Sequence, residues 1–362
     1  MISTLQRYYG MRFFTTLIAV LSGVFVLIIL LDYVEQMRRM GDEPNTSALT
    51  IAKISLFRVP QIAERILPFC VLVGAMSCFL GLSRRLEFVV SRAAGMSAWQ
   101  FTAPAIVVAM GVGVIGTTIY NPVAAVLHER AKRMEAEIFG NNAEGLRATA
   151  NGFWVSQRSD EGQSIINAAG SSEQGVSLSK VSAFVFDHSN QFLERVEAAT
   201  AVLEAGQWRL KTARIYVPGS PPVARPFYLL ATNLTPEQIR ETLSTPETVP
   251  FWQLPYYIDM AERAGLAASA YRLQYQKLLS RPFMLAAMVL LAAAFSLRFF
   301  RMGGVQKMVL GGIASGFALY IMSKLTDDLS KAALLPPMIA AWMPAVVGAM
   351  TGFVALLYQE DG

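Results

Sequence analysis

Charged residues are scarce in this sequence: only 16% of its 362 residues are Asp, Glu, Lys or Arg. Because soluble domains carry about 25% charged residues, this shortage argues against a protein that lies wholly in water. The mean hydropathy of +0.40 is nevertheless too low for a chain that lies entirely in lipid. The composition therefore predicts membrane spans together with one sizeable water-exposed domain, and it excludes a disordered chain, a coiled coil and a disulfide scaffold.

Cysteine and histidine are equally rare. The two cysteines, Cys70 and Cys78, fall in one apolar segment about 12 Å apart if it is helical, which is too far for a disulfide. The two histidines, His128 and His188, stand alone without the H-E-x-x-H or C-x-x-C spacing of a metal site. Glycine-rich nucleotide-binding loops are missing too, and no nucleophile–base pair can be assembled. We therefore expect no metal, no cofactor and no catalytic centre in this chain.

Six apolar segments are long enough to cross a bilayer, although the fourth is short. They are residues 13–31, 66–83, 101–120, 283–297, 308–323 and the stretch between 337 and 358. The first is too long for a cleavable signal peptide. Arg281 and Arg298 flank the fourth segment, and we expect both side chains to snorkel toward the membrane surface. The segments as delimited contain no carboxylate, which argues against a carrier coupled to protons or sodium ions.

About 150 residues of a different character separate the third and fourth segments. Short β-rich runs alternate there with turn signals at residues 189–190, 205–206 and 218–219, a pattern typical of an antiparallel sandwich or roll. Helical patterns return at residues 236–237, 254–264 and 269–279. The expected fold class is thus an α-helical membrane protein with six transmembrane helices, arranged 3+3, and an inserted antiparallel β domain. The expected domains are residues 1–127, 128–250 and 251–362.

Orientation in the membrane is only weakly encoded. The two sides carry about eight and about seven basic residues, so the positive-inside rule is almost evenly balanced. A cytoplasmic N-terminus is favoured because it puts the β domain outside, and because the basic residues on the outer side are mixed with acidic ones. The net charge of +5 suggests anionic partners, although membrane proteins are often basic near lipid headgroups.

The loop after the second span predicts an amphipathic helix. Residues 83–97 place Glu87 near the start and Gly95 at the C-cap. One face would be apolar, formed by Leu86, Val89, Val90 and Ala93. Two interpretations follow from this pattern: a helix that lies on the membrane surface, or a coupling helix that docks into another protein.

Several motifs, taken together with their order along the chain, resemble those of a known family. They are residues 84–97, Val59-Pro60 and Leu67-Pro68-Phe69 upstream, residues 32–39 at the end of the first span, and Leu335-Pro336-Pro337 before the sixth. Together they resemble the permease family of the lipopolysaccharide export machine, and within it the G-type members more than the sister F-type members. The resemblance covers essentially the whole chain.

The resemblance implies a location and a set of partners. It implies a multi-pass protein of the inner membrane of a Gram-negative bacterium, with both termini cytoplasmic and a periplasmic β-jellyroll-like domain. The implied partners are an F-type permease (LptF), a dimer of a cytosolic ATPase (LptB-type), periplasmic bridge proteins with jellyroll domains (LptC- and LptA-type), lipopolysaccharide and membrane lipids, with no nucleic acid. ATP hydrolysis would take place in the ATPase.

The resemblance also assigns candidate site residues. The residues expected to couple to the ATPase are Glu87, Arg84, Leu86 and Arg92. The residues expected to bind lipopolysaccharide are Arg38, Arg39, Arg130, Arg133 and Glu35, with an apolar lining of Phe25, Ile28, Ile29, Leu67, Phe317, Tyr320 and Ile321. Arginine forks suit phosphate oxygens. Asp32 departs from the family pattern, which has a lysine there in its better-known members.

Other interpretations remain open at this stage. The sister F-type permease is the nearest, followed by a membrane-anchored binding or scaffold protein and by an intramembrane lipid-modifying enzyme. The small-residue pairs Gly312–Gly316 and Gly348–Gly352 permit close helix approach, either at a gate between subunits or within this chain.

Overall fold

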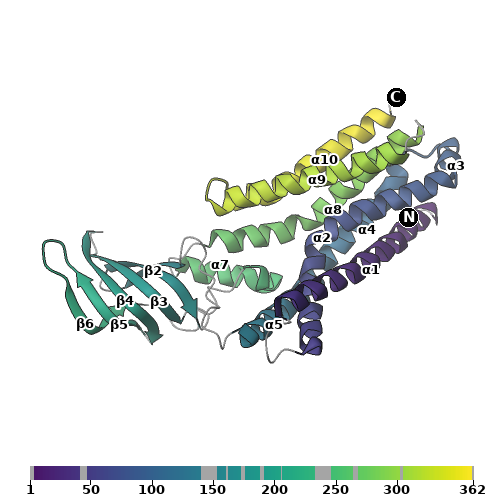
Figure 1. The fold of residues 1–362 in the computed structure, drawn as a ribbon. Coiled ribbons are helices and arrows are strands. Elements are labelled where there is room, and N and C mark those ends of the chain that lie inside the picture. Colours follow the sequence, from purple (N-terminus) through teal and green to yellow (C-terminus); the bar gives the residue numbers. More distant parts are fainter. Residues whose placement is uncertain are drawn as a thin grey trace. The chain divides into compact units, whose positions relative to one another are not determined.

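The computed structural model describes most of the chain, and the described residues fall into two compact units. The helical unit comprises Met1–Lys132, Pro250–Trp252 and Arg272–Gly362, and the β unit comprises Arg133–Val249 and Gln253–Tyr271. Both are drawn in Figure 1. The described residues are 4–40, 47–139, 153–159, 162–172, 176–187, 191–204, 206–232, 246–263, 268–301 and 305–360.

Long helices dominate the helical unit. Six helical segments among the described residues are long and apolar enough to cross a membrane, which confirms the six predicted spans. The helices are α1 (Thr4–Met40), α2 (Ala48–Arg84), α4 (Ala98–Ile115) running through the π-helix η1 (Gly116–Tyr120) into α5 (Asn121–Phe139), α8 (Ser269–Arg301), α9 (Val305–Lys331) and α10 (Pro337–Glu360). Most of them extend well beyond the predicted apolar segments, because polar residues at the ends continue the same helices.

The core of the helical unit forms around α8. Every residue from 285 to 294 in this helix is buried, which is the signature of a helix surrounded by others. Phe13 and Leu17 of α1, Leu72 of α2 and Phe101 of α4 are buried in the same cluster. Since lipid tails are as apolar as these side chains, van der Waals packing and polar contacts hold the helices together rather than the hydrophobic effect.

The small-residue pairs pack within this chain. A Cβ at Gly316 of α9 would lie 2.5 Å from Leu72 Cδ2 of α2, and a Cβ at Gly352 of α10 would lie 2.7 Å from Leu290 Cβ of α8. No side chain of ordinary size fits at such distances. Both glycines therefore allow close helix approach inside the helical unit, and a role at a gate between subunits stays a prediction.

The β unit contains one antiparallel sheet. Its described strands are β1 (Phe153–Ser159), β2 (Gly162–Ser172), β3 (Ser177–Phe186), β4 (Phe192–Glu204), β5 (Gln207–Tyr216) and β6 (Val223–Ala231). They pair in sequence order, each with its neighbour in the chain (Figure 1). Gly206 and Gly219 have φ of +79° and +80°, so both lie in left-handed turns, as the turn signals predict. The fold class expected from the sequence is confirmed.

A line of interrupted strand pairing, called the crease below, crosses this sheet. Lys180 and Thr212 have φ of 50° and 56°, and strand pairing is interrupted beside them in β2 through β6 without a change of register. On each side of the crease the buried residues alternate with period 2, but across it they are three apart, as at Leu178 and Val181. One additional position in β3, β4 and β5 keeps the apolar side chains on both sides of the crease on one face of the sheet.

Short helical segments complete the description. The connections carry the 3-10 turns η3 (Pro246–Thr248) and η4 (Phe251–Gln253), and α7 (Leu254–Arg263) follows. The helix predicted at residues 254–264 is α7, and the one predicted from residue 269 is the start of α8. The helix predicted at residues 236–237 lies outside the described residues.

We predict that Gly352→Ala destabilises the protein. The new methyl group would meet Leu290 Cβ at 2.7 Å and backbone atoms of residues 290 and 291 at 2.9 and 3.0 Å, so α10 must move away from α8. Overpacking of this kind costs about 1–3 kcal/mol. Thermal unfolding in detergent measures the loss, with Gly23→Ala as the control because nothing lies within 4 Å of its added Cβ. Equal melting temperatures for the two variants would contradict this account of α10 packing.

Candidate functional site

The amphipathic helix after the second span is α3 (Glu87–Ala93). Its N-cap Leu86 has a left-handed backbone with φ of 58°, and Gly95 ends the segment with φ of 82°. Ser97 then begins α4 with a capping box closed by Gln100. Glu87 at the start and Arg92 in the last turn match the helix dipole. Glu87 lies at the start of the helix as predicted, but the C-cap is Ala94, one residue before the predicted Gly95, and the helix is shorter than residues 84–97.

One face of α3 is anchored to the helical unit. Phe88 and Ser91 are buried, with exposed fractions of 4% and 7%. The Phe88 ring lies 4.6 Å from the Phe101 ring of α4, and Ser91 Oγ lies 2.5 Å from the hydroxyl of Tyr9 in α1. The helix is therefore in direct contact with two membrane helices.

The opposite face of α3 is apolar and exposed. Leu86, Val89 and Val90 are 57%, 48% and 68% exposed, and Ala93 is exposed as well. Arg84 at the end of α2 is also exposed, whereas Glu87 and Arg92 are half-buried at its edge. The predicted apolar face is thus present, and it points away from the chain's own packing.

Two arginines share one carboxylate near the end of α1. The Arg38 guanidinium donates to both Glu35 carboxylate oxygens at 3.1 Å, and Arg39 Nε donates to Glu35 Oε1 at 2.6 Å. The arginine side chains are 76% and 51% exposed. Ion pairs this exposed contribute little stability, but they orient both guanidinium groups on one side of the helix and leave one net positive charge.

Asp32 has a different role from the arginine pair. Its side chain is only 8% exposed, it accepts a hydrogen bond from Ser55 Oγ at 2.6 Å, and it lies 3.6 Å from Arg58 Nε. Both partners belong to α2. Asp32 therefore ties α1 to α2, and Arg58 supplies the positive charge at this level.

The other basic candidates are on α5. Arg130 is exposed and belongs to the helical unit. Arg133 belongs to the β unit, and its side chain lies outside the described residues. Their part in lipid binding stays a prediction.

The apolar residues predicted to line the lipid site differ in how exposed they are. Phe317, Tyr320 and Ile321 are exposed on α9 by 55%, 49% and 42%, and the Tyr320 ring lies 5.7 Å from that of Phe69 in α2. The candidates on α1 and α2 are less accessible: Ile28 and Leu67 are buried, and Phe25 and Ile29 are half-buried. The residues on α9 form the exposed part of the predicted lining, and lipid contact by any of the seven stays a prediction.

A buried ion pair was missed at the sequence level. Glu64 of α2 and Arg281 of α8 have side chains only 5% and 15% exposed, and the Arg281 guanidinium donates to Glu64 Oε1. Asn121 Nδ2 donates to the same oxygen at 2.9 Å, while Asn121 Oδ1 accepts from the Phe251 N–H at 3.0 Å. The predicted segment 66–83 contains no carboxylate, but the expectation is wrong for the whole of α2, because this helix extends beyond the segment and carries Glu64.

The expected snorkelling of Arg281 is wrong as well. Its guanidinium turns inward because an available carboxylate compensates its charge better than a distant headgroup would. A longer second helix in the prediction would have indicated the buried carboxylate. Helix α2 runs 37 residues and includes Glu64, which lies outside the predicted apolar segment. The side chain of Arg298 lies outside the described residues.

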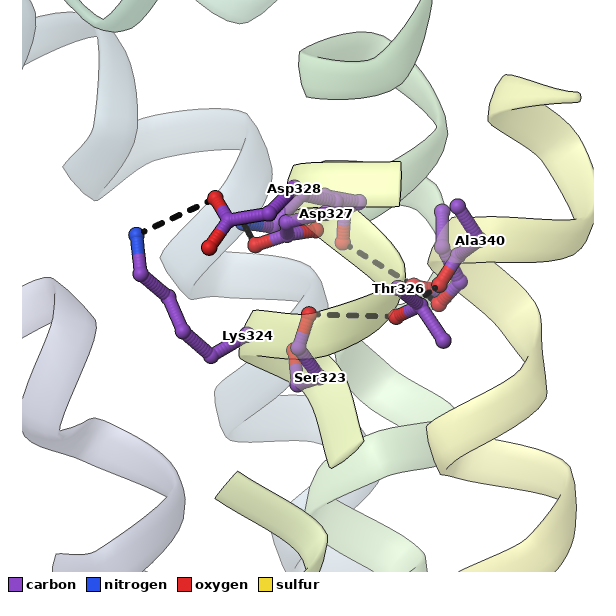
Figure 2. Close-up of polar contacts among 9 residues, drawn as sticks. Ser323, Lys324, Thr326, Asp327, Asp328 and Ala340 are labelled. Carbon is purple, nitrogen blue, oxygen red and sulfur yellow. Dashed lines mark hydrogen bonds and ion pairs between the residues drawn. The ribbon is translucent and has the colours of Figure 1, made fainter. Parts of the chain in front are cut away.

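A second polar network joins α8, α9 and α10. Lys277 Nζ of α8 lies 2.6 Å from Asp327 Oδ2 of α9. At the adjacent residue, Thr326 Oγ1 is 3.0 Å from the carbonyl oxygens of Ser323 and Ala340, the latter in α10 (Figure 2). The figure also shows the more exposed pair of Lys324 with Asp328, 3.5 Å apart.

These features define a class: a polytopic membrane protein whose six spanning helices carry an inserted antiparallel β unit and an exposed amphipathic helix. The sequence model of the lipopolysaccharide export system permease LptF/LptG matches residues 7–358, and the chain belongs to this family. It is 25% identical over 354 residues to the lipopolysaccharide export system permease protein LptG of Escherichia coli (strain K12), covering 94% of both chains. It is 21% identical over 352 residues to the LptG of Haemophilus influenzae, covering 96% of both.

We predict that Glu64→Gln strongly destabilises the helical unit. The substitution leaves the Arg281 guanidinium buried without its carboxylate, and breaking a buried pair costs about 3–5 kcal/mol. Neutralising both partners, as Glu64→Gln with Arg281→Gln, should recover part of the loss. Thermal unfolding in detergent measures each variant.

The matched control for this prediction is Glu35→Gln. Its carboxylate is exposed, so we expect a change within about 1 kcal/mol. A loss at Glu64 no larger than the loss at Glu35 would show that the buried pair does not stabilise the fold.

Proposed function

We propose that this chain is the G-type permease subunit of an ATP-driven transporter that extracts lipopolysaccharide from the inner membrane and passes it to a periplasmic bridge. Family membership over residues 7–358 carries the proposal. The six spans with an inserted β unit support it, because a lipid exporter needs both a membrane path and a water-exposed acceptor for the lipid. The relatives named above are LptG proteins, which favours the G-type over the F-type subunit.

The proposed assembly has an ATPase on the cytoplasmic side. The exposed apolar face of α3 is suited to insert into a groove of an LptB-type ATPase dimer, with Glu87 and Arg92 as polar contacts at its edge. This chain is non-catalytic and holds no cofactor in the proposal, since ATP hydrolysis belongs to the partner. An F-type permease completes the membrane part.

The proposed orientation follows from the span count. With α3 on the cytoplasmic side, both termini are cytoplasmic, and the three spans before the β unit put that unit in the periplasm. There its creased sheet, with an apolar inner face, suits transfer of acyl chains to LptC- and LptA-type bridge proteins.

The proposed mechanism transmits movement through α3. Closure of the ATPase dimer would push on its exposed face, and the contacts of Ser91 with Tyr9 and of Phe88 with Phe101 would pass that movement to α1 and α4. Displacement of α1 would move Arg38 and Arg39. In this scheme the arginines hold lipid phosphates, and the exposed apolar residues of α9 contact acyl chains.

We predict that Glu87→Ala abolishes coupling while the protein still folds. Loss of the carboxylate should lower lipopolysaccharide export at least about tenfold, since one charged contact contributes about 1.5–3 kcal/mol. Export is measured as lipopolysaccharide reaching the cell surface, and a pull-down from native membranes reports whether the second permease and the ATPase co-purify. Lys307→Ala, a change at an exposed position in the first turn of α9, is the control. Full export by Glu87→Ala would disprove the assigned role of this residue.

We predict that Arg38→Gln with Arg39→Gln weakens lipid binding. Each substitution removes a charged hydrogen-bond donor worth about 1.5–3 kcal/mol to a phosphate group. Glu35→Gln should leave binding equal or stronger, because it frees the guanidinium groups from their carboxylate. Crosslinking of lipopolysaccharide to the purified complex measures binding, with Arg263→Gln on α7 as the control. Unchanged crosslinking in the double variant would remove these arginines from the binding site.

A further inference from the structure

Prolines interrupt the backbone hydrogen bonding of several membrane helices. A proline has no N–H, so the carbonyl four residues before it loses the donor that an α-helix normally supplies. Inside a bilayer water cannot replace that donor, and the carbonyl must find another partner. Two such carbonyls have a side-chain donor on a neighbouring segment: Leu278, freed by Pro282, and Ala340, freed by Pro344.

The carbonyl freed by Pro344 of α10 is satisfied by α9. Thr326 Oγ1 lies 3.0 Å from the Ala340 carbonyl oxygen, and the threonine is only 5% exposed (Figure 2). The same hydroxyl is 3.0 Å from the Ser323 carbonyl of its own helix, so its one proton is shared between the two. A second hydroxyl, Ser280 Oγ of α8, lies 3.0 Å from the next carbonyl, that of Ala341.

The carbonyl freed by Pro282 of α8 is satisfied by the π-helix η1. Thr117 Oγ1 donates to the Leu278 carbonyl at 2.9 Å, and Thr117 is 4% exposed. Helix α4 approaches the proline itself, because a Cβ at Gly113 would lie 2.6 Å from Pro282 Cα. The interrupted turn of α8 is therefore packed against the neighbour that supplies the missing donor.

The irregular turn before Pro122 has a contact of the same kind, at the π-helix η1 and not at a proline-freed carbonyl. Trp252 Nε1 donates to the Thr118 carbonyl at 3.0 Å. Trp252 is 66% exposed, so this contact is more accessible than the other two. In all three cases the donor is a side chain of another segment, 14 to 161 residues away in sequence.

We propose that Thr326 and Thr117 are positioning residues, which fix the geometry of α10 and α8 by donating to the carbonyls that Pro344 and Pro282 leave without a backbone donor. A helix bends easily at a proline because one hydrogen bond is missing. A donor on a neighbouring segment selects one bend and ties it to that neighbour. The inference rests on the proposed function. It adds that these contacts set the helix geometry from which transport starts.

A double-mutant cycle at the Thr326–Pro344 pair tests the inference. Thr326→Val removes the donor at nearly constant volume, and Pro344→Ala restores the backbone N–H that can reach the Ala340 carbonyl. We expect Thr326→Val to lower the melting temperature of the full chain in detergent by about 2 °C in the natural background. In the Pro344→Ala background the same change should have under half that effect, because the carbonyl no longer depends on the threonine.

Two further variants make the cycle specific. Thr326→Ser keeps the hydroxyl and should retain the melting temperature and the lipopolysaccharide exported per ATP hydrolysed, whereas Thr326→Val should lower that export ratio at least about twofold. Thr351→Val is the matched control, because Thr351 Oγ1 donates to the Val347 carbonyl within α10 and should show no coupling to residue 344.

The outcomes separate this inference from the proposed function. An equal effect of Thr326→Val in both backgrounds, or an unchanged export ratio, would overturn the inference. A complex that exports no lipopolysaccharide even with the natural chain would overturn the proposed function, while the melting-temperature cycle would still decide whether Thr326 fixes the geometry of α10 at Pro344.

Discussion

A bilayer offers no hydrogen-bond partner to the polar groups that a membrane helix buries, and this constraint shapes the whole helical unit. Several buried polar groups here find their partners inside the chain. Examples are the Glu64–Arg281 pair, the Asn121 amide beside it, and the hydroxyl groups that donate to proline-freed carbonyls. Because apolar packing alone gives little preference for one helix arrangement in lipid, these polar contacts fix which helices are neighbours. Glycines such as Gly352 then allow the close approach that the contacts need.

In the proposed mechanism, a short helix has a mechanical role. Helix α3 has only 7 residues, yet its buried side contacts both α1 and α4 while its apolar side stays exposed. A force on the exposed side would therefore reach the helix that carries Arg38 and Arg39. This continuity from an exposed apolar face to exposed basic groups is what the proposed function requires of a subunit driven by a separate ATPase.

Much of the fold could be predicted because its determinants are local. Continuous apolar runs predict the spans, alternation and turn residues predict the strands, and Gly95 with Glu87 predicts α3. Contacts between helices were harder. Glu64 falls just outside the apolar window of α2, and nothing near it in sequence indicates Arg281, 217 residues away. Whether Gly316 serves a gate or a packing contact likewise depends on what lies opposite.

The sequence by itself therefore determined the membrane class, the six spans, the inserted β unit, the amphipathic helix and the family, since hydropathy, periodicity and motif order are properties of the chain. Only the tertiary structure decided which polar groups meet: Arg281 turns inward to Glu64, Asp32 binds α2 rather than joining the arginine pair, and Thr326 satisfies a carbonyl of α10. The physical reason is that a buried polar group takes its partner from whichever segment lies beside it in space, and adjacency in space is not written at any fixed spacing along the chain.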